Sequence, residues 1–280
     1  MLIFRTVAAI QSWIADQKLT TKSIGFVPTM GALHAGHISL IAQSKSENAL
    51  TLCSIFVNPT QFNDPADLEK YPRTLESDTK LLVTGGCDVL FYPSVKEIYP
   101  TDLPEVKVKL NGLDEVMEGI HRPGHFKGVV QVVYRLLDIV KPHRLYMGQK
   151  DFQQFTIIGQ MIDDLNLKVK LIVCPIFREE NGLAMSSRNA RLSDQGKEKA
   201  GIIYKTLQEG IAQKNKLSPE EINEYCFQKI NHIPFEPEYV EIVNPKTLKP
   251  IRNWDESKNY VICAAVWLEG VRLIDNIIFD

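Results

Sequence analysis

The chain has few cysteines and no long apolar run, and both shortages exclude classes of protein. Its five cysteines stand far apart among 280 residues, mostly within apolar stretches. An odd number of scattered thiols does not form a disulfide framework and indicates buried, reduced cysteines. No stretch approaches the roughly 18 apolar residues of a membrane span, and the first residues lack the pattern of a signal peptide. We therefore expect a cytoplasmic protein with no membrane partner.

An excess of charge of either sign is also missing. The chain has 32 Lys and Arg against 34 Asp and Glu, mixed along its length, and a formal net charge of -2. A nucleic-acid-binding protein normally shows a basic patch, so no nucleic-acid partner is expected. The 44% hydrophobic composition supports a real core, and 280 residues suffice for one large domain or two ordinary ones.

Strand-like and helix-like segments alternate up to about residue 177, with short breaks between them. Several strand-like segments are nearly continuous apolar runs, as expected for strands covered on both faces. The expected strands are Ile24–Val27, Leu50–Val57, Val89–Phe91, Arg144–Met147 and Lys170–Val173. The expected helices are His37–Ser46, Thr74–Val83, Val129–Ile139 and Phe152–Leu165. The pattern predicts an α/β fold with a Rossmann-like, doubly wound parallel sheet.

The pattern changes after this region, which predicts a first domain over residues 1–182 and a smaller C-terminal α+β lid domain over 183–280. Two helices are expected first. One of them begins after Ser218, an N-cap that is followed by Pro219 and, at the third helical position, Glu221. The expected strands are Pro237–Val243, Val261–Leu268 and Val271–Ile274, with Glu269-Gly270 as a hairpin turn.

The most informative segment runs from Gly25 to His37, where an apolar strand breaks into a helix. His34 and His37 are three residues apart, so they share one face of that helix and can direct ring N–H groups at the same anion. Gly36, between them, lets a phosphate approach the backbone closely. The helix N-terminus adds unpaired N–H groups and a positive dipole end. The segment therefore predicts a site for the phosphates of a nucleoside triphosphate.

Closely spaced histidines also bind metals, so a zinc site is the alternative for this segment. Structural zinc needs four protein ligands, and catalytic zinc needs three and a water molecule. No cysteine or acidic residue stands at ligand spacing near His34 and His37. We therefore prefer phosphate recognition and expect no metal held by protein ligands.

Two further polar motifs follow expected strands. Asn58-Pro59-Thr60-Gln61-Phe62 comes after the second strand, where the Gln61 amide offers an acceptor and a donor to a bound molecule. Gly148-Gln149-Lys150-Asp151 comes after the fourth strand. Lys150 supplies a cation for phosphate there, and Asp151 supplies an acceptor for ribose hydroxyls. The alternatives are an ordinary turn for the first motif and a solvated helix start for the second.

A third motif, Met185-Ser186-Ser187-Arg188-Asn189, stands in the apparent linker between the expected domains. Two hydroxyls beside a guanidinium form a phosphate clamp, and a hinge position would let the clamp close over a nucleotide. A polar loop is the alternative. Residues 121–128 are rich in donors and glycine, and they are a candidate mobile wall of the pocket.

Six ordered motifs resemble those of the pantothenate synthetases, the pantoate:beta-alanine ligases of the HIGH-motif nucleotidyltransferase-like superfamily. They are PTMGALHAGH, FVNPTQF, HRPGHFKGV, MGQKDFQQ, NGLAMSSRN and RLIDN, and they cover nearly the whole chain. The resemblance implies an ATP-dependent condensation of pantoate with beta-alanine through a pantoyl adenylate, with release of AMP and pyrophosphate. It also implies Mg²⁺ with the ATP, a first domain that binds ATP and pantoate, and a homodimer.

The same resemblance implies three groups of site residues. The residues that contact ATP would be Met30, Gly31, Ala32, Leu33, His34, Ala35, Gly36, His37, Gly148, Gln149, Lys150, Asp151, Phe177, Met185, Ser186, Ser187 and Arg188. The catalytic residues would be His37, His34, Lys150 and Arg188, with His37 at the position of a proton donor. Pantoate would be held by Gln61, Gln154 and Asn58. Phe177 departs from the smaller aliphatic residue that is usual where the backbone borders adenine.

Two other functions stay open at this point. A cofactor adenylyltransferase has the same HxGH motif but leaves AMP on its product. A noncatalytic nucleotide-sensing module would bind ATP without turnover. An enzyme that charges tRNA is disfavoured by the lack of a basic surface. We interpret Asp78 as an acid on the exposed face of a helix, with a role beside magnesium as the alternative, since phosphate oxygens and water often hold Mg²⁺.

Overall fold

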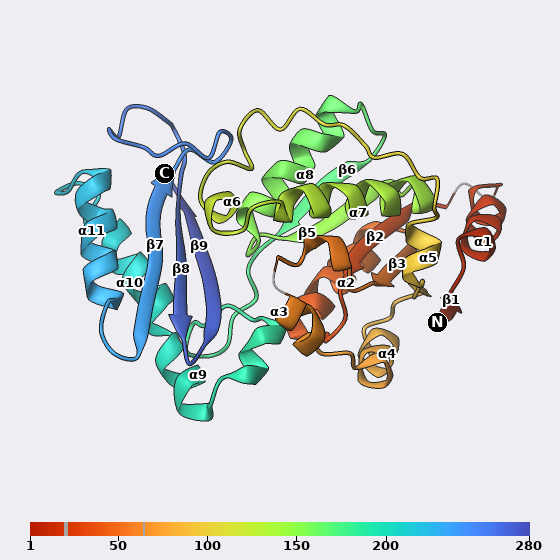
Figure 1. Ribbon diagram of the computed structural model, residues 1–280, viewed down its shortest axis with the longest axis horizontal. Coiled ribbons are helices and arrows are strands. Elements are labelled where there is room, and N and C mark those ends of the chain that lie inside the picture. The colour runs from red at the N-terminus through yellow and green to blue at the C-terminus, as the bar shows by residue number, and fades with distance from the viewer. Residues whose placement is uncertain (20–21, 64) are drawn as a thin grey trace. The chain divides into compact units, whose positions relative to one another are not determined.

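The computed structural model describes residues 1–19, 22–63 and 65–280, which form two compact units (Figure 1). The first unit comprises Met1–Gly148 and Ile157–Cys174, and the second comprises Gln149–Thr156 and Pro175–Asp280. The chain therefore enters the second unit twice. The predicted fold class, a doubly wound parallel sheet with a smaller α+β part, is confirmed.

The first unit is built on a parallel sheet that has six strands within the described ranges, in the order β1-β4-β3-β2-β5-β6. The strands are β1 (Leu2–Phe4), β2 (Ile24–Thr29), β3 (Leu50–Ile55), β4 (Val89–Phe91), β5 (Arg144–Gly148) and β6 (Lys170–Cys174). The direction of winding reverses between β2 and β5. Parallel sheets bind ligands beside the carboxyl ends of strands at such a reversal, so the segments that follow β2 and β5 are placed for binding.

Two groups of helices cover this sheet. The helices are α1 (Val7–Leu19), α2 (Ala35–Glu47), η1 (Pro59–Gln61), α3 (Pro65–Lys70), α4 (Leu75–Thr84), α5 (Val95–Ile98), α6 (Glu118–His121), α7 (His125–Val140) and α8 (Phe152–Asp164). Helix α2 packs on β2, β3 and β5 and against α4, while α7 packs on β2 and against α1 and α5. In the part of the chain that the structure describes, no helix has the length and apolar character needed to cross a membrane.

The second unit is an antiparallel sheet in the order β7-β8-β9 with helices packed on it. Its elements are η2 (Ser187–Arg191), α9 (Asp194–Ala200), α10 (Ile202–Ile211), α11 (Pro219–Ile230), β7 (Phe235–Val243), β8 (Tyr260–Leu268) and β9 (Val271–Phe279). The predicted start of α11 is confirmed, because the Ser218 hydroxyl accepts from the Glu221 N–H and the Glu221 carboxylate accepts from the Ser218 N–H. The predicted hairpin is confirmed as well, with Glu269 and Gly270 both at positive φ.

The end predicted for the last strand is wrong. Strand β9 continues beyond Ile274, because Asp275 pairs in register with Ala264 and Asn276 with Cys263. Asp and Asn are disfavoured in strands, so a prediction from residue propensity ends the strand before them, although the pairing with β8 continues.

The boundary predicted after residue 182 lies inside the second unit, within a hairpin of the main chain. Arg178 and Ala184 form an isolated antiparallel bridge, and the Glu179 N–H donates to the Leu183 carbonyl at 2.8 Å. The change of compact unit comes earlier, between Cys174 and Pro175.

All five cysteines are buried and free, as the sequence predicts. Burial raises the pKa of Cys87 to about 11 and that of Cys226 to about 12. We expect a thiol reagent at pH 8 to modify the native protein slowly and to modify all five thiols after unfolding, since the thiolate is the reactive form. Rapid labelling of the native protein, measured by mass spectrometry, would contradict this burial.

Candidate active site

The loop that leaves β2 is held by Asp78. Its Oδ2 accepts from the Ala32 N–H at 3.0 Å, and its Oδ1 accepts from the Leu33 N–H at 2.8 Å and from the Thr74 hydroxyl at 3.2 Å. Gly31 and Ala32 both have positive φ, 84° and 50°, a conformation that costs free energy for alanine. The carboxylate therefore anchors an unfavourable turn that leads directly into α2.

The interpretation of Asp78 as an exposed acid is wrong, because its side chain is only 1% exposed. Helix α4 turns this residue towards the β2 loop instead of towards solvent. A carboxylate has about four acceptor sites, and protein donors occupy three of them here. Asp78 therefore fits an anchor of the loop and does not fit a ligand of Mg²⁺.

The two histidines cap the start of α2 reciprocally. The Gly36 N–H donates to Nδ1 of His34 at 3.2 Å, and the His34 N–H donates to Nδ1 of His37 at 3.3 Å. The ring centroids are 4.1 Å apart. A neutral imidazole whose Nδ1 accepts carries its proton on Nε2, so this cap fixes both tautomers as Nε2–H donors. Neutral donors at a helix N-terminus suit an anion such as phosphate.

A zinc site receives no support from the geometry around these rings. Both Nδ1 atoms accept backbone protons, so neither of them is available to a metal. Among residues 1–19, 22–63 and 65–280, no group of three or more His, Cys, Asp or Glu side chains is arranged to hold a metal ion.

The turn after β3 presents Gln61 from a short 3₁₀ helix, η1. The Gln61 amide lies between two neighbours: its Oε1 accepts from Asn58 at 3.2 Å, and its Nε2 lies 3.0 Å from the sulfur of Met30. Asn58 is 1% exposed, and its Oδ1 also accepts from the hydroxyls of Thr60 and Tyr99 at 3.0 and 2.9 Å. Asn58 therefore orients Gln61, which is the member of this pair that faces the β2 loop.

The first helical turn of α7 packs against the η1 turn and forms hydrogen bonds with it. The Asn58 amide donates to the Gly128 carbonyl at 3.1 Å, and Nδ1 of His125 lies 2.8 Å from the Gln61 carbonyl. A Cβ on Gly128 would lie 2.3 Å from the Thr60 carbonyl oxygen, so only glycine fits at this approach. Sequence reasoning assigned residues 121–128 to a mobile wall. His125, Phe126 and Gly128 are instead buried parts of a helix.

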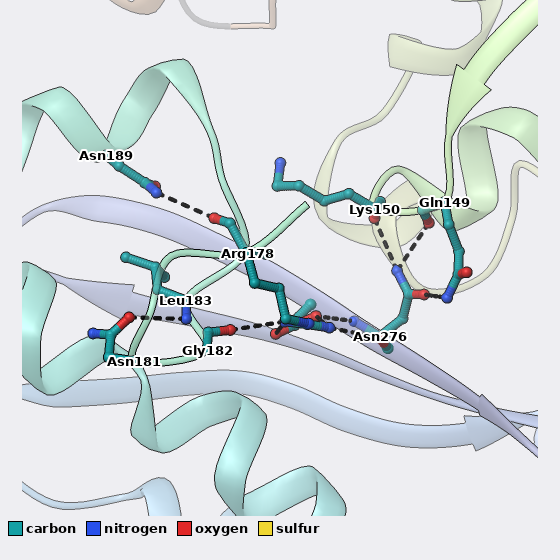
Figure 2. A network of polar contacts seen from close by, with 10 residues as sticks. Gln149, Lys150, Arg178, Asn181, Gly182, Leu183, Asn189 and Asn276 are labelled. Carbon is teal, nitrogen blue, oxygen red and sulfur yellow. Dashed lines mark hydrogen bonds and ion pairs between the residues drawn. The ribbon is translucent and has the colours of Figure 1, made fainter. Parts of the chain in front are cut away.

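In the second unit, Gln149 and Lys150 are tied to Asn276 of β9 (Figure 2). The Asn276 amide donates to the Gln149 and Lys150 carbonyls at 3.1 and 2.9 Å, and its Oδ1 accepts from the Gln149 amide at 3.1 Å. The Lys150 side chain extends away from Asn276. Asp151 is exposed and Gln154 is partly buried at the start of α8. The main chain is thus fixed while the Lys150 ammonium reaches outward.

Arg178 forms the second centre of this network. It binds Asp275 through two bonds of 2.7 and 2.8 Å and donates to the Gly182 carbonyl at 2.9 Å (Figure 2). Its guanidinium carbon also lies 3.6 Å from the centre of the Tyr204 ring. Burial raises the pKa of Asp275 above its ordinary value, although the Arg178 guanidinium opposes the shift. A bidentate pair with a stacked guanidinium holds the hairpin of residues 178–184 rigidly.

The segment Met185–Arg188 follows that hairpin directly and lies within the second unit, whereas the sequence placed it in an apparent linker between two domains. The Met185 N–H donates to the carbonyl of Phe177, whose side chain is 44% exposed, at 3.0 Å. Ser186 caps η2 by accepting from the Arg188 N–H at 3.3 Å. The two serines and the arginine therefore begin a capped helical turn within the second unit.

Each unit brings together one part of the predicted site. In the first unit, the β2 loop, the start of α2 and the η1 turn contribute Met30, Gly31, Ala32, Leu33, His34, Ala35, Gly36, His37, Asn58 and Gln61, and β5 ends at Gly148. In the second unit, the Asn276 network and η2 contribute Gln149, Lys150, Met185, Ser186, Ser187 and Arg188. The sequence did not indicate the anchoring roles of Asp78, His125, Asp275 and Asn276, which hold these parts.

Comparisons with known proteins agree with this fold. The family model described as pantoate-beta-alanine ligase matches residues 2–278. Proteins named pantothenate synthetase are 47% identical in Cytophaga hutchinsonii, with 99% of both chains covered, and 51% identical in Azobacteroides pseudotrichonymphae, with 100% of both covered.

Solved structures give the same result. Pantothenate synthetase from Thermus thermophilus has a TM-score of 0.91 at 38% identity, with 99% of each chain covered. Pantoate-beta-alanine ligase from Francisella tularensis, complexed with beta-gamma ATP and beta-alanine, has a TM-score of 0.81 at 40% identity, with 99% of this chain and 97% of that chain covered. The chain therefore belongs to the pantoate-beta-alanine ligase family of enzymes, the pantothenate synthetases.

Proposed function

We propose that this enzyme condenses pantoate with beta-alanine at the expense of ATP, through a pantoyl adenylate. The observation that carries the proposal is the reciprocal cap of His34 and His37, which fixes two Nε2–H donors at one helix N-terminus. Family membership over residues 2–278 supports it, and so does the relative that was solved with an ATP compound and beta-alanine.

The first step joins pantoate to AMP. A pantoate carboxylate oxygen attacks the α-phosphorus of ATP, and the bond to pyrophosphate breaks. The nucleophile is already ionised, so the protein mainly aligns the reactants and stabilises charge on the phosphates. We assign that work to His34, His37, Lys150 and Arg188. The remaining ATP contacts are proposed for the main chain of 30–37 and 148–151, for Phe177 and for Met185–Ser187.

The second step forms the amide. The beta-alanine amine attacks the carbonyl carbon of the adenylate, AMP leaves and the amine loses a proton. Gln61, oriented by Asn58, and Gln154 are proposed to hold pantoate. Magnesium would accompany ATP through phosphate oxygens and water, since Asp78 is occupied by backbone donors. A homodimer and a cytoplasmic location belong to the same proposal and rest on the sequence resemblance.

The proposal is tested by analysing nucleotide products with ATP, magnesium and pantoate, with and without beta-alanine. We expect pyrophosphate, pantothenate and free AMP during turnover, with pantothenate and multiple turnovers appearing only when beta-alanine is present. AMP that stays attached to the product would instead identify an adenylyltransferase. ATP binding without any turnover would identify a sensing module, and ADP would identify phosphoryl transfer.

A Gly128→Ala variant tests the role of the η1 turn. The added Cβ would lie 2.3 Å from the Thr60 carbonyl oxygen and 2.8 Å from Cα of Gln61, both of them backbone atoms. We expect the free energy of unfolding to fall by about 1–3 kcal/mol. The KM for pantoate should rise by about 10-fold or more, because a displaced positioning residue loses alignment.

The matched control is Gly159→Ala, another glycine inside a helix of the first unit. Its Cβ would meet only Leu171 Cδ2, at an ordinary contact distance of 3.6 Å. This control should keep the wild-type KM and gain a little stability from helix propensity. Equal pantoate KM values for the two variants would show that α7 does not position Gln61.

A further inference from the structure

Strand β9 presents two adjacent polar residues that are almost fully buried. Asp275 is 5% exposed and Asn276 is 2% exposed. Successive side chains of a strand point to opposite faces, so Asp275 shares the face of Val271 and Leu273, which belong to the hydrophobic core of the second unit. Asn276 lies on the other face. Buried polar groups are costly unless they are paired, so the partners of both side chains matter.

The Asn276 side chain is fully used by one segment of the main chain. Its amide hydrogens go to the consecutive carbonyls of Gln149 and Lys150, and its oxygen accepts from the Gln149 side chain (Figure 2). Three bonds from one rigid amide to two neighbouring residues fix the backbone position from which the Lys150 side chain departs. Both amide hydrogens are engaged, so Asn276 acts through Lys150 and not on a ligand.

Asp275 holds a different segment from the opposite face of the same strand. It pairs with Arg178, whose guanidinium also donates to the Gly182 carbonyl. The hairpin of residues 178–184 is thereby fixed to β9. The hairpin continues into Met185, whose N–H donates to the Phe177 carbonyl. The position of the first residue of Met185–Arg188 therefore depends on the bonds between Asp275 and Arg178.

We propose that Asp275 and Asn276 are positioning residues that hold Lys150 and the Met185–Arg188 segment at a fixed position relative to each other. This inference rests on the proposed function of those two segments. One dipeptide of a strand bonds residues 149 and 150 directly and bonds Arg178 of the hairpin that leads into Met185. It thereby keeps the spacing of the two segments constant, and such preorganisation is what alignment of a triphosphate requires.

The test compares Asn276→Ala with Asn244→Ala. Asn244 is an asparagine of the same unit whose side chain accepts from the Lys246 and Thr247 N–H groups at 2.9 and 3.2 Å, without contacting Gln149, Lys150 or Arg178. We expect Asn276→Ala to slow pantoate-dependent formation of pyrophosphate by about 10- to 100-fold, with little change in the KM for beta-alanine. Asn244→Ala should lower thermal stability only.

A second readout needs no activity. Hydrogen exchange of the peptide covering residues 149–156 should be faster in Asn276→Ala and unchanged in Asn244→Ala, because only the first loses the bonds to that segment. Asn276→Asp, which keeps the size of the side chain but loses both donors, should repeat the effect if the alanine variant folds poorly.

Unchanged exchange, or kinetics equal to those of Asn244→Ala, would overturn the inference. Failure of the proposed function is distinguishable, because the wild-type enzyme would then form no pantothenate. Faster exchange together with slower pyrophosphate formation, in variants that fold as the control does, is the expected result.

Discussion

Replacing His37 with alanine is expected to lower the rate of pantothenate formation by about 10²-fold or more, because one preorganised donor in a transition state contributes on this scale. The donor is Nε2–H, since Nδ1 of His37 accepts from the His34 N–H. Steady-state kinetics measures the effect. The variant should remain folded, because the lost capping bond costs only about 1 kcal/mol.

Two amide variants separate the capping role of His37 from the donor role. The oxygen of asparagine can take the place of Nδ1, so His37→Asn keeps an acceptor for the His34 N–H and loses the outer donor. The longer glutamine places its N–H₂ group near the position of Nε2. We expect His37→Gln to retain more activity than His37→Asn. The opposite order would show that His37 serves the helix cap and not the phosphates.

Removing Asp78 is expected to give the largest loss of stability among single changes near the β2 loop. Asp78→Ala leaves the N–H groups of Ala32 and Leu33 without their acceptor, and an unsatisfied buried donor costs about 1–3 kcal/mol. Thermal unfolding should shift down by roughly 5–15 °C. Activity should fall as well, because the strained turn that leads into His34 loses its anchor.

Glu76 of the same helix provides the control for Asp78. Its side chain is 86% exposed and pairs with Lys80, at 2.7 Å in a solvent-exposed ion pair. Glu76→Ala should change the free energy of unfolding by less than about 0.5 kcal/mol. If Asp78→Ala unfolds at the same temperature as Glu76→Ala, the carboxylate does not anchor the loop.

The parallel sheet was predictable because its central strands are recognisable in the sequence as short apolar runs. Val89–Phe91 matches β4 at both ends, and Ile24–Val27 lies within β2, since strands covered on both faces are short apolar runs between breakers. The reciprocal histidine cap was only partly predictable. Spacing predicted that His34 and His37 share one helix face, but His34 is the N-cap with extended backbone and α2 begins at Ala35. The choice of tautomer depends on this backbone geometry, which spacing does not contain.

The anchors could not be predicted, because their roles depend on partners far away in the sequence. Asp78 looks like an exposed acid of an amphipathic helix, and its two backbone partners in the β2 loop lie 45 and 46 residues earlier. Strand β1 carries a weak pattern, with two of its three residues exposed, so it depends on its pairing with β4. Helix α1 likewise depends on distant partners, because it packs against α7. Local strand propensity also placed the end of the last strand before Asp275, although Asp275 and Asn276 pair in register with Ala264 and Cys263.

The bond from Gln149 to Asn276 joins residues that are 127 positions apart, and this separation sets an order for biosynthesis. Chains emerge from the ribosome amino end first, and domains fold as their residues become available. The 149–156 segment therefore leaves the ribosome long before the strand that receives it. Until β9 has been made and released, the carbonyls of Gln149 and Lys150 lack their bonds to Asn276, so the proposed position of Lys150 is reached only after β9 has joined the sheet.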